Sequence, residues 1–121
     1  MVVGVIGAGA SGMAAALAAA ENENVQVLLF ERQARVGKKL LATGNGRCNL
    51  TNIHAAIRHY HGETPDFCRV ALEKYGVEDT LNWFSSLGLY TVTEDSGRVY
   101  PYLQPRLPGL WFQFLLVSSL M

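Results

Sequence analysis

Short apolar runs and an alanine-rich stretch alternate at the start of the chain. Residues 2–6 are mostly β-branched, and a second apolar run occupies residues 25–30. Between them, residues 13–20 are almost all good helix formers, within a helix expected at about residues 10–21. This order predicts a strand, a helix and a second strand, with residues 2–6 as a buried strand. We therefore expect a βαβ unit at the N-terminus.

The pattern changes after residue 31. Glycines interrupt a short basic segment that is too glycine-rich for a long helix, so we predict a loop with one helical turn. A helix is then expected from Thr64, whose side chain would cap it, to Gly76, which would stop it. A second helix is predicted at about residues 78–87, before Gly88.

The last patterned stretch predicts a β-hairpin. Residues 89–94 and 98–100 flank the short turn sequence Asp95-Ser96-Gly97. The helix pair and this hairpin together indicate an insertion from a second domain, which would begin near residue 60.

Composition and charge narrow the class of protein. Half of the 121 residues are hydrophobic and the formal net charge is zero, so we expect a globular core and no broad basic field for nucleic acid. Two cysteines, Cys48 and Cys68, are too few for a disulfide framework, which makes a reducing cytosol the simplest compartment. The longest apolar run, residues 110–121, is shorter than a membrane span. We therefore predict a cytoplasmic protein without a membrane partner.

Glycines of a dinucleotide-binding turn follow residues 2–6. Gly7 would permit the tight turn, Gly9 would leave room for a pyrophosphate, and Gly12 would let the helix pack close to the strand. The helix would then face the phosphates with its free N–H groups and positive dipole end. Glu31 ends the second apolar run 19 positions after Gly12, where an acid holds ribose hydroxyls. The alternative is a βαβ unit with a glycine-rich turn and no ligand.

A second motif, GKKLLATGNGRCNLTN, occupies residues 37–52. Its flexible backbone would allow a ligand to approach closely, and its cations would attract phosphate. Its short polar side chains would hydrogen-bond a heterocycle or a sugar. On these grounds alone, a solvated polar loop is an equally good interpretation.

Residues 1 to about 102 resemble the N-terminal part of the BaiN/YhiN-type flavoproteins, often described as NAD(P)/FAD-dependent or aminoacetone-oxidase-like oxidoreductases. The shared stretches are VIGAGASGMAAA, the FER that ends the second strand, the motif at residues 37–52, and GRVYP. The resemblance implies an α/β fold with a Rossmann-like, FAD-binding βαβ unit of the glutathione-reductase type, followed by the start of an α+β insertion. It also implies tightly bound FAD, with NAD(P)H as a candidate reductant.

The resemblance assigns ligand contacts to particular residues. Glu31 would bind the adenosine ribose, Arg32 would lie beside the adenine, and Lys39 would lie near the ribose or phosphate. An acid at this position favours the unphosphorylated ribose of FAD over that of NADP. The pyrophosphate would be lined by Gly7, Gly9, Ala10, Ser11 and Gly12, and the ribityl–flavin side by Gly44, Asn45, Gly46, Arg47, Cys48 and Asn49.

Several residues are candidates for chemistry of their own. Arg47 is the candidate donor near the flavin ring, where it would stabilise charge on the reduced flavin. Cys48 lacks a CxxC partner, which favours a small packing residue over a redox-active thiol. The histidines His54, His59 and His61 do not share a helix face, so surface positions are favoured over a metal site.

The resemblance ends near Tyr102. Two prolines after it oppose a helix, and the tail is apolar, aromatic and almost uncharged. Family members are also several times longer than this chain. We therefore expect residues 1–59 to be the N-terminal part of an incomplete FAD-binding domain, and residues 60–102 to begin a second domain. Residues 103–121 would be a tail foreign to the family, as in a truncated product.

The functional prediction is an N-terminal fragment of an FAD-dependent oxidoreductase, catalytically incomplete as it stands, with a small-molecule cofactor as its ligand. Two alternatives stay open. One is a non-catalytic nucleotide- or partner-binding fragment, whose apolar tail docks on another chain. The other is a flavin-dependent reductase of an RNA base, which the neutral charge of this segment does not support. The substrate, and the choice between NADH and NADPH, do not follow from these residues.

Overall fold

A computed structural model describes residues 1–102, which form two compact units, Met1–Cys48 and residues 49–102. Each unit has its own strands and helices. The sequence places a domain boundary at residue 59, whereas the compact units divide after Cys48. A compact unit of this structure need not coincide with a domain of a longer protein. The boundary at residue 59 therefore stays a prediction. The tail predicted for residues 103–121 lies outside the described residues.

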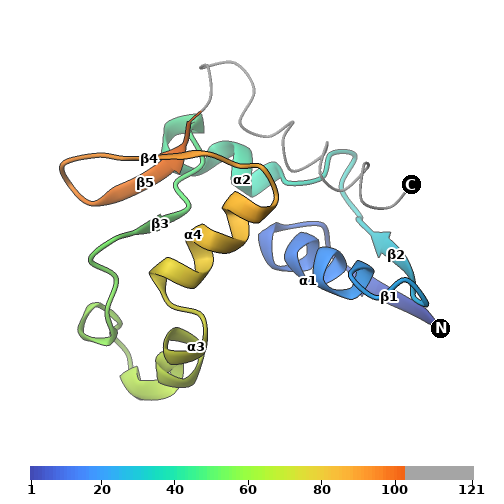
Figure 1. Cartoon of the computed structure of the whole chain (residues 1–121), viewed down its shortest axis with the longest axis horizontal. Coiled ribbons are helices and arrows are strands. Elements are labelled where there is room, and N and C mark those ends of the chain that lie inside the picture. Colours follow the sequence, from blue (N-terminus) through green and yellow to red (C-terminus); the bar gives the residue numbers. More distant parts are fainter. Residues whose placement is uncertain (103–121) are drawn as a thin grey trace. The chain divides into compact units, whose positions relative to one another are not determined.

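The first unit is a βαβ unit, as the sequence predicts (Figure 1). β1 (Val2–Ile6) and β2 (Gln26–Phe30) pair in parallel over their whole length. α1 (Ala10–Ala20) is the crossover between them, and it buries Met13 and Ala16. The many alanines of α1 let the helix lie close to the strands.

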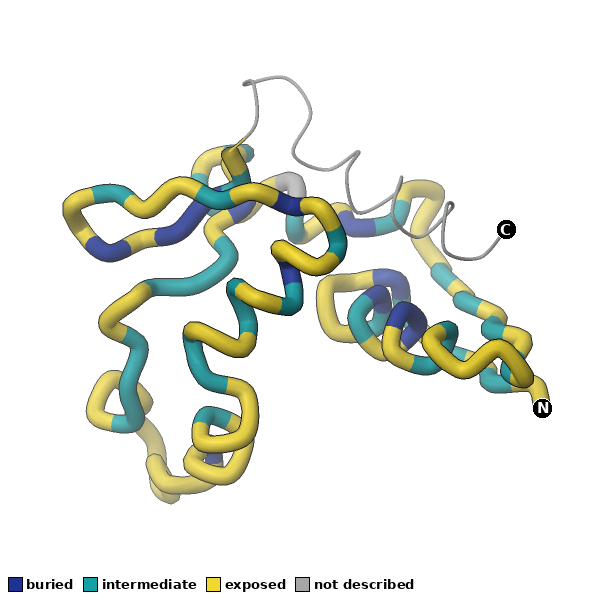
Figure 2. Tube along the Cα trace, viewed as in Figure 1, coloured by how far each residue is buried: buried dark blue, intermediate teal, exposed yellow. Residues whose placement is uncertain are grey.

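The strands of this unit are half-buried on one face and exposed on the other, which corrects the prediction of a buried strand at residues 2–6. Half-buried and exposed residues alternate along both strands (Figure 2). Ile6 is 91% exposed, and Phe30, paired with it on β2, is 56% exposed. The reason is that α1 covers one face, whereas a parallel strand is fully buried only when both faces of its sheet are covered. The apolar pattern therefore matches a two-sided environment that residues 1–102 do not supply.

The second unit contains a three-stranded antiparallel sheet in the order β3–β5–β4. β4 (Thr91–Thr93) and β5 (Arg98–Pro101) form the predicted hairpin, whose turn closes where the Gly97 N–H donates to the Glu94 carbonyl over 2.8 Å. β3 (Thr51–Asn52) pairs with β5. The sequence pattern does not indicate β3, because two residues carry no measurable periodicity.

Short helices connect β3 to β4 in this unit. They are η2 (Ile57–His59), η3 (Pro65–Cys68), α3 (Arg69–Lys74) and α4 (Val77–Ser86). The helix predicted from residue 64 is thus a 3-10 turn followed by a short α-helix. The Thr64 side chain caps neither of them in the described chain, so the capping prediction is wrong.

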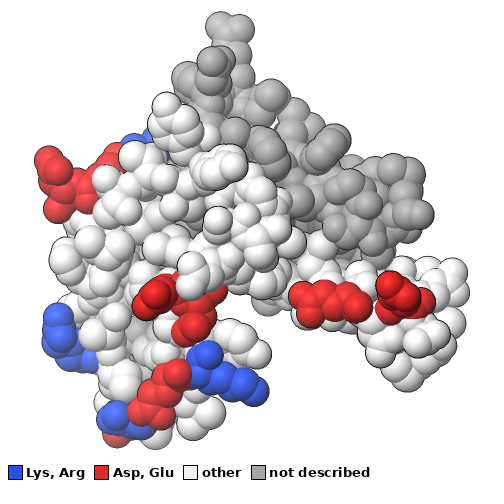
Figure 3. Space-filling view, in the orientation of Figure 1, with Lys and Arg blue, Asp and Glu red and all other residues white. Residues whose placement is uncertain are grey.

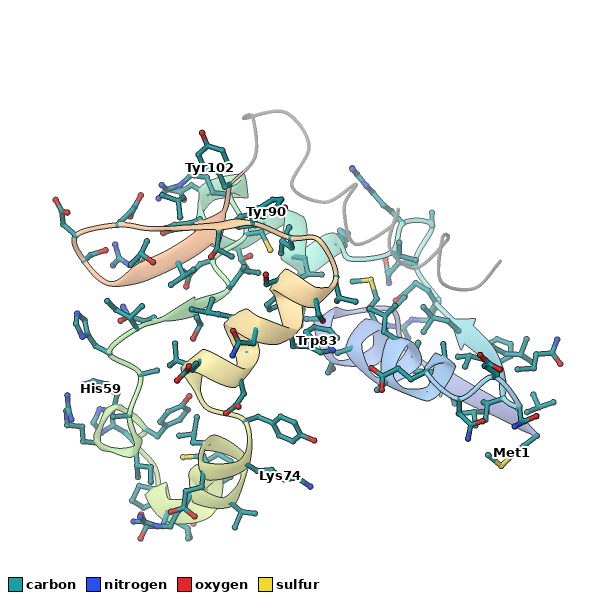
Figure 4. The ribbon with its side chains drawn as sticks, viewed as in Figure 1. Met1, His59, Lys74, Trp83, Tyr90 and Tyr102 are labelled. Carbon is teal, nitrogen blue, oxygen red and sulfur yellow. The ribbon has the colours of Figure 1, made fainter. Side chains whose placement is uncertain are left out.

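α4 lies between Gly76 and Gly88, as predicted. The Gly76 N–H donates to Oδ2 of Asp79 over 3.0 Å, which satisfies one backbone donor at the start of the helix. Trp83 lies on α4 (Figure 4), and its ring meets the ring of buried Phe84 edge-on, with centroids 5.0 Å apart. Phe84 belongs to the core of the second unit, and half-buried Trp83 packs against it.

Charged side chains around α3 pair locally. Figure 3 shows acidic and basic side chains side by side at this end of the second unit. Arg69 lies 2.8 Å from Asp66 and 3.7 Å from Glu73. All three side chains are largely exposed, so these ion pairs contribute little to stability.

Candidate functional site

The turn after β1 holds α1 close to the strand. A Cβ atom on Gly12 would overlap the Gly7 carbonyl oxygen, so a larger residue there would force the turn to move. The Gly7 N–H donates to the Phe30 carbonyl over 2.7 Å, which joins the end of β1 to the end of β2. The predicted turn glycines therefore stand where two strand ends and a helix start meet.

The space in front of Gly9 is open. A Cβ atom on Gly9 would meet no described atom within 4 Å, and Gly9, Ala10 and Ser11 are exposed. Gly9 is the N-cap of α1, and within residues 1–102 no side chain caps this helix and no acid lies in its first turn. The first N–H groups of α1 and its positive dipole end therefore face accessible space, an arrangement that fits a phosphate or pyrophosphate group.

Glu31 follows β2 and reaches back to this turn. Its Oε2 atom accepts the Ala8 N–H over 2.8 Å, and its Oε1 atom accepts the Gln33 N–H over 2.7 Å. These hydrogen bonds hold the pKa of the Glu31 carboxyl below its ordinary value, with the largest effect from Gln33 and a smaller one from the charge of Arg32. The carboxylate is therefore ionised at neutral pH, and it keeps lone pairs for hydroxyl donors such as those of a ribose.

The basic segment docks on the same turn. α2 (Lys38–Ala42) is the single helical turn predicted there, and it begins at Gly37, which is buried with φ of 64°. The Gly37 N–H donates to the Ala8 carbonyl over 2.9 Å. A Cβ atom on Gly37 would lie 3.5 Å from Cε of Met13 on α1. The turn, the end of β2 and the start of α2 are thus joined at Ala8.

Residues that follow β2, together with residues of α2, line a hollow of about 450 Å³. Arg35 and Lys38 supply two cations to it, and Gln33 supplies an amide. Arg32 and Lys39, which the sequence places beside the adenine and near the ribose or phosphate, are not among the described residues that line this hollow, and their ligand contacts stay predictions. The rotation of α2 decides which of two adjacent lysines lines it, and a basic run in the sequence does not reveal that rotation. The described lining is Gln33, Ala34, Arg35, Lys38 and Ala42.

The second motif has an unusual backbone after α2. η1 (Thr43–Gly46) includes left-handed residues, and Asn45 and Cys48 are the described non-glycine residues with positive φ, at 54° and 58°. Arg47 is exposed, and its Nε–H donates to the Gly44 carbonyl over 3.4 Å. Left-handed non-glycine residues are uncommon and concentrate at functional sites, which favours a shaped binding segment over a simple solvated loop.

Cys48 is a buried packing residue of the first unit. It is 3% exposed, and its N–H donates to the Thr43 carbonyl over 3.0 Å. Burial raises the pKa of the Cys48 thiol, against a smaller lowering effect from a hydrogen bond with the Thr43 side chain. A buried neutral thiol is a weak nucleophile, so this geometry supports the packing interpretation over the redox one.

Asn49 belongs to the second unit, where its amide supports the sheet. Nδ2 of Asn49 donates to the carbonyls of Thr51 and Val99, both over 3.1 Å. Both donors of this amide thus bind sheet carbonyls, and only its carbonyl oxygen is left to meet a ligand. The predicted role of Asn49 beside the flavin stays a prediction.

The histidines His54, His59 and His61 are exposed, in agreement with their spacing. Within residues 1–102, no three side chains of the metal-binding types gather at one place. No helix in that range combines the length and the apolar character needed to cross a membrane.

Comparison of the sequence with known proteins identifies relatives of this chain. The model of the family described as HI0933-like protein Rossmann domain matches residues 1–105. The chain is similar to 3-dehydro-bile acid delta(4,6)-reductase of Clostridium scindens, with 50% identity over 100 residues, which are 82% of this chain and 24% of that protein. It is also similar to the ribosomal RNA dihydrouridine synthases of Escherichia coli and Haemophilus influenzae. These share 32% and 30% identity over 96 residues, which are 79% of this chain and 24% of each relative. The matched stretch thus spans about a quarter of the length of these relatives.

Proposed function

Because the chain belongs to the HI0933-like protein Rossmann domain family, we propose that it binds FAD as part of an FAD-dependent oxidoreductase. One observation carries the proposal. The open N-terminus of α1, at Gly9, and the Glu31 carboxylate lie at the same turn. The carboxylate accepts the N–H of Ala8, the residue before Gly9. A dinucleotide presents a pyrophosphate and a ribose, the two groups that a helix N-terminus and a carboxylate recognise.

In this proposal, the predicted residues bind and orient the cofactor. The turn residues hold the pyrophosphate, and Glu31 accepts the hydroxyls of the adenosine ribose. Arg32 and Lys39 are cations for the adenosine-diphosphate end of the cofactor. Arg35 and Lys38 are two more, because both line the hollow formed by residues that follow Glu31 in the sequence. The flavin side lies along residues 44–49, with Arg47 as the candidate donor. When bound, FAD would supply the redox chemistry, and these residues would hold and orient it.

The relatives suggest the substrate class. The 50% identical relative is named a 3-dehydro-bile acid delta(4,6)-reductase, so reduction of a small molecule of that kind is our first candidate. Two more distant relatives are named ribosomal RNA dihydrouridine synthases, which makes reduction of an RNA base the second candidate. The formal net charge of zero favours the first, because RNA phosphates are bound chiefly by excess basic charge.

NAD(P)H is the proposed reductant, bound elsewhere than at the glycine turn. The Glu31 carboxylate suits a ribose hydroxyl and would repel a 2′-phosphate at this place. The proposed setting is cytoplasmic, with small molecules rather than a membrane as ligands.

Gly9→Ala tests the proposal by placing a methyl group in the open space at the start of α1, where the pyrophosphate would bind. The backbone at Gly9 is extended, with φ of −81°, and the added methyl group would meet no described atom within 4 Å. The free energy of unfolding should therefore fall by no more than about 1 kcal/mol, the cost of alanine in place of glycine at an N-cap. FAD affinity, measured by flavin fluorescence quenching, should fall by at least about tenfold because the methyl group blocks the pyrophosphate.

Gly76→Ala is the matched control in the second unit. Gly76 has φ of −72°, and a Cβ atom there would make ordinary contacts at 3.5 Å with Asp79 and Leu72. This variant should bind FAD like the unchanged chain. A chain that leaves flavin fluorescence unaltered, or a Gly9→Ala variant that binds FAD as well as the unchanged chain, would contradict the proposal.

A further inference from the structure

We propose that Glu31 is a positioning residue for the phosphate-binding turn, in addition to binding the ribose. The inference rests on the proposed function, because it concerns how the turn is held ready for a pyrophosphate. It follows from the hydrogen bonds around Ala8, which lies between Gly7 and Gly9 in that turn.

Both backbone polar groups of Ala8 are bound by distant segments. Its N–H donates to Oε2 of Glu31 over 2.8 Å, and its carbonyl accepts the Gly37 N–H over 2.9 Å. Ala8 is fully buried in the folded chain, where the Glu31 carboxylate is bound to its N–H. A buried N–H without an acceptor is unfavourable, and Glu31 is the side chain that supplies this acceptor. The position of the turn therefore depends on the carboxylate even before a ligand binds.

The carboxylate has enough acceptor sites for both roles. Its two oxygens offer about four lone-pair sites, and the N–H groups of Ala8 and Gln33 use one on each oxygen. The Arg32 N–H also acts on this carboxylate, and the acceptor capacity that remains suits a ribose hydroxyl. A glutamine at this position has an NH₂ group in place of one oxygen, so the Ala8 and Gln33 N–H groups, which donate to different oxygens of Glu31, cannot both keep their present acceptors. Glu31→Gln thus removes one of these two bonds with little change in side-chain size.

Inorganic pyrophosphate separates the two roles, because it carries the phosphates of the cofactor without any ribose. If Glu31 positions the turn, Glu31→Gln should weaken pyrophosphate binding by about tenfold, the factor expected for one lost charge-assisted hydrogen bond. If Glu31 only binds ribose, the substitution removes a negative charge near an anion and should leave the affinity unchanged or raise it. The two roles therefore predict different signs.

Binding would be measured by NMR shifts of the Gly9 and Ser11 amides during titration with pyrophosphate, and by flavin fluorescence with FAD. Glu21→Gln is the matched control, because it changes the net charge equally at the other end of α1. Pyrophosphate affinity should be unchanged in this control. An unchanged or increased pyrophosphate affinity in Glu31→Gln would overturn the proposal.

A pH titration of the unchanged chain tests the same point without relying on a variant. The amide proton shifts of Ala8 and Gln33 should titrate together, with a midpoint below the ordinary glutamate pKa, because both N–H groups donate to the same carboxylate. Arg32 is the charged group that acts on this carboxylate, and the backbone N–H groups of Gln33, Ala8 and Arg32 act on it as donors. Stability from these bonds is present above the unfolded pKa of Glu31 and is lost as the pH falls through the folded one.

An Ala8 amide that does not follow this titration would overturn the positioning role. If the two amides titrate together but FAD does not bind, the proposed function fails and the positioning of the turn stands. The two inferences can therefore fail separately.

Discussion

The two compact units hold their strand ends in different ways. In the second unit, a short turn joins β4 to β5, and the Gly97 N–H closes it on Glu94 three residues earlier. In the first unit, the strand ends are held where Ala8, Glu31 and Gly37 meet from three separate segments. An antiparallel hairpin is local, whereas a parallel pair needs a crossover and long-range contacts. Single changes near the glycine turn should therefore have larger consequences than comparable changes in the hairpin.

Gly12→Ala should have the largest effect. Within a helix, alanine is ordinarily favoured over glycine by about 1 kcal/mol. Here the added Cβ atom would overlap the Gly7 carbonyl oxygen, so the sign should reverse. We expect a loss of about 3 kcal/mol or more in the free energy of unfolding of the first unit.

Urea denaturation would measure this loss, and NMR amide shifts would locate it. The shifts should change throughout α1 and β1 while the β4–β5 hairpin keeps its own. A Gly12→Ala variant as stable as the unchanged chain, or more stable, would show that the close approach of α1 to the turn is absent in solution.

Gly97→Ala should have an intermediate effect, confined to the second unit. Gly97 has φ of 78°, and a Cβ atom there would lie 2.6 Å from Cδ2 of His54 and 2.7 Å from Oδ1 of Asn52. The left-handed backbone alone costs a non-glycine residue about 1 kcal/mol, and the two close contacts should raise the loss to about 2–3 kcal/mol. Thermal unfolding would measure the loss, and amide exchange in β5 would locate it.

Gly88→Ala is the matched comparison for this prediction. Gly88 has φ of 79°, but a Cβ atom there would meet no described atom within 4 Å. The Gly88→Ala variant should therefore lose only about 1 kcal/mol in the free energy of unfolding, the cost of the left-handed backbone. Equal losses in the two variants would mean that Asn52 and His54 do not pack against the hairpin turn.

The sequence predicted those parts of the fold that depend on local pattern. The βαβ unit, the hairpin and α4 follow from apolar periodicity and from glycines at their ends. β3 was missed because Thr51 and Asn52 acquire their strand character from a distant partner on β5. Residues 2–6 were predicted to be buried because their composition suits a sheet covered on both faces, and only one face is covered within residues 1–102.

In the candidate site too, the features tied to local sequence pattern could be predicted, and those that depend on tertiary arrangement could not. The glycine turn and Glu31 could be predicted because their spacing is tied to the geometry of a βαβ unit. The bond from Ala8 to Glu31 could not, since it depends on where a side chain points after β2. The hollow lined by Arg35 and Lys38 could not be predicted from the sequence either, because it depends on how α2 is rotated about its axis.

Val2→Thr should have the smallest effect, and it tests whether the outer face of β1 is open in solution. Valine and threonine have nearly the same shape, so the substitution mainly adds a hydroxyl group. Val2 is 60% exposed, and its variant should change the free energy of unfolding by less than about 0.5 kcal/mol. Val99→Thr, at a position with no exposure, should cost about 1–3 kcal/mol, because the hydroxyl is buried. Urea denaturation would measure both. A Val2→Thr loss as large as that of Val99→Thr would mean that another surface covers β1 in solution, and the contrast between a one-faced parallel pair and a self-contained hairpin would no longer hold.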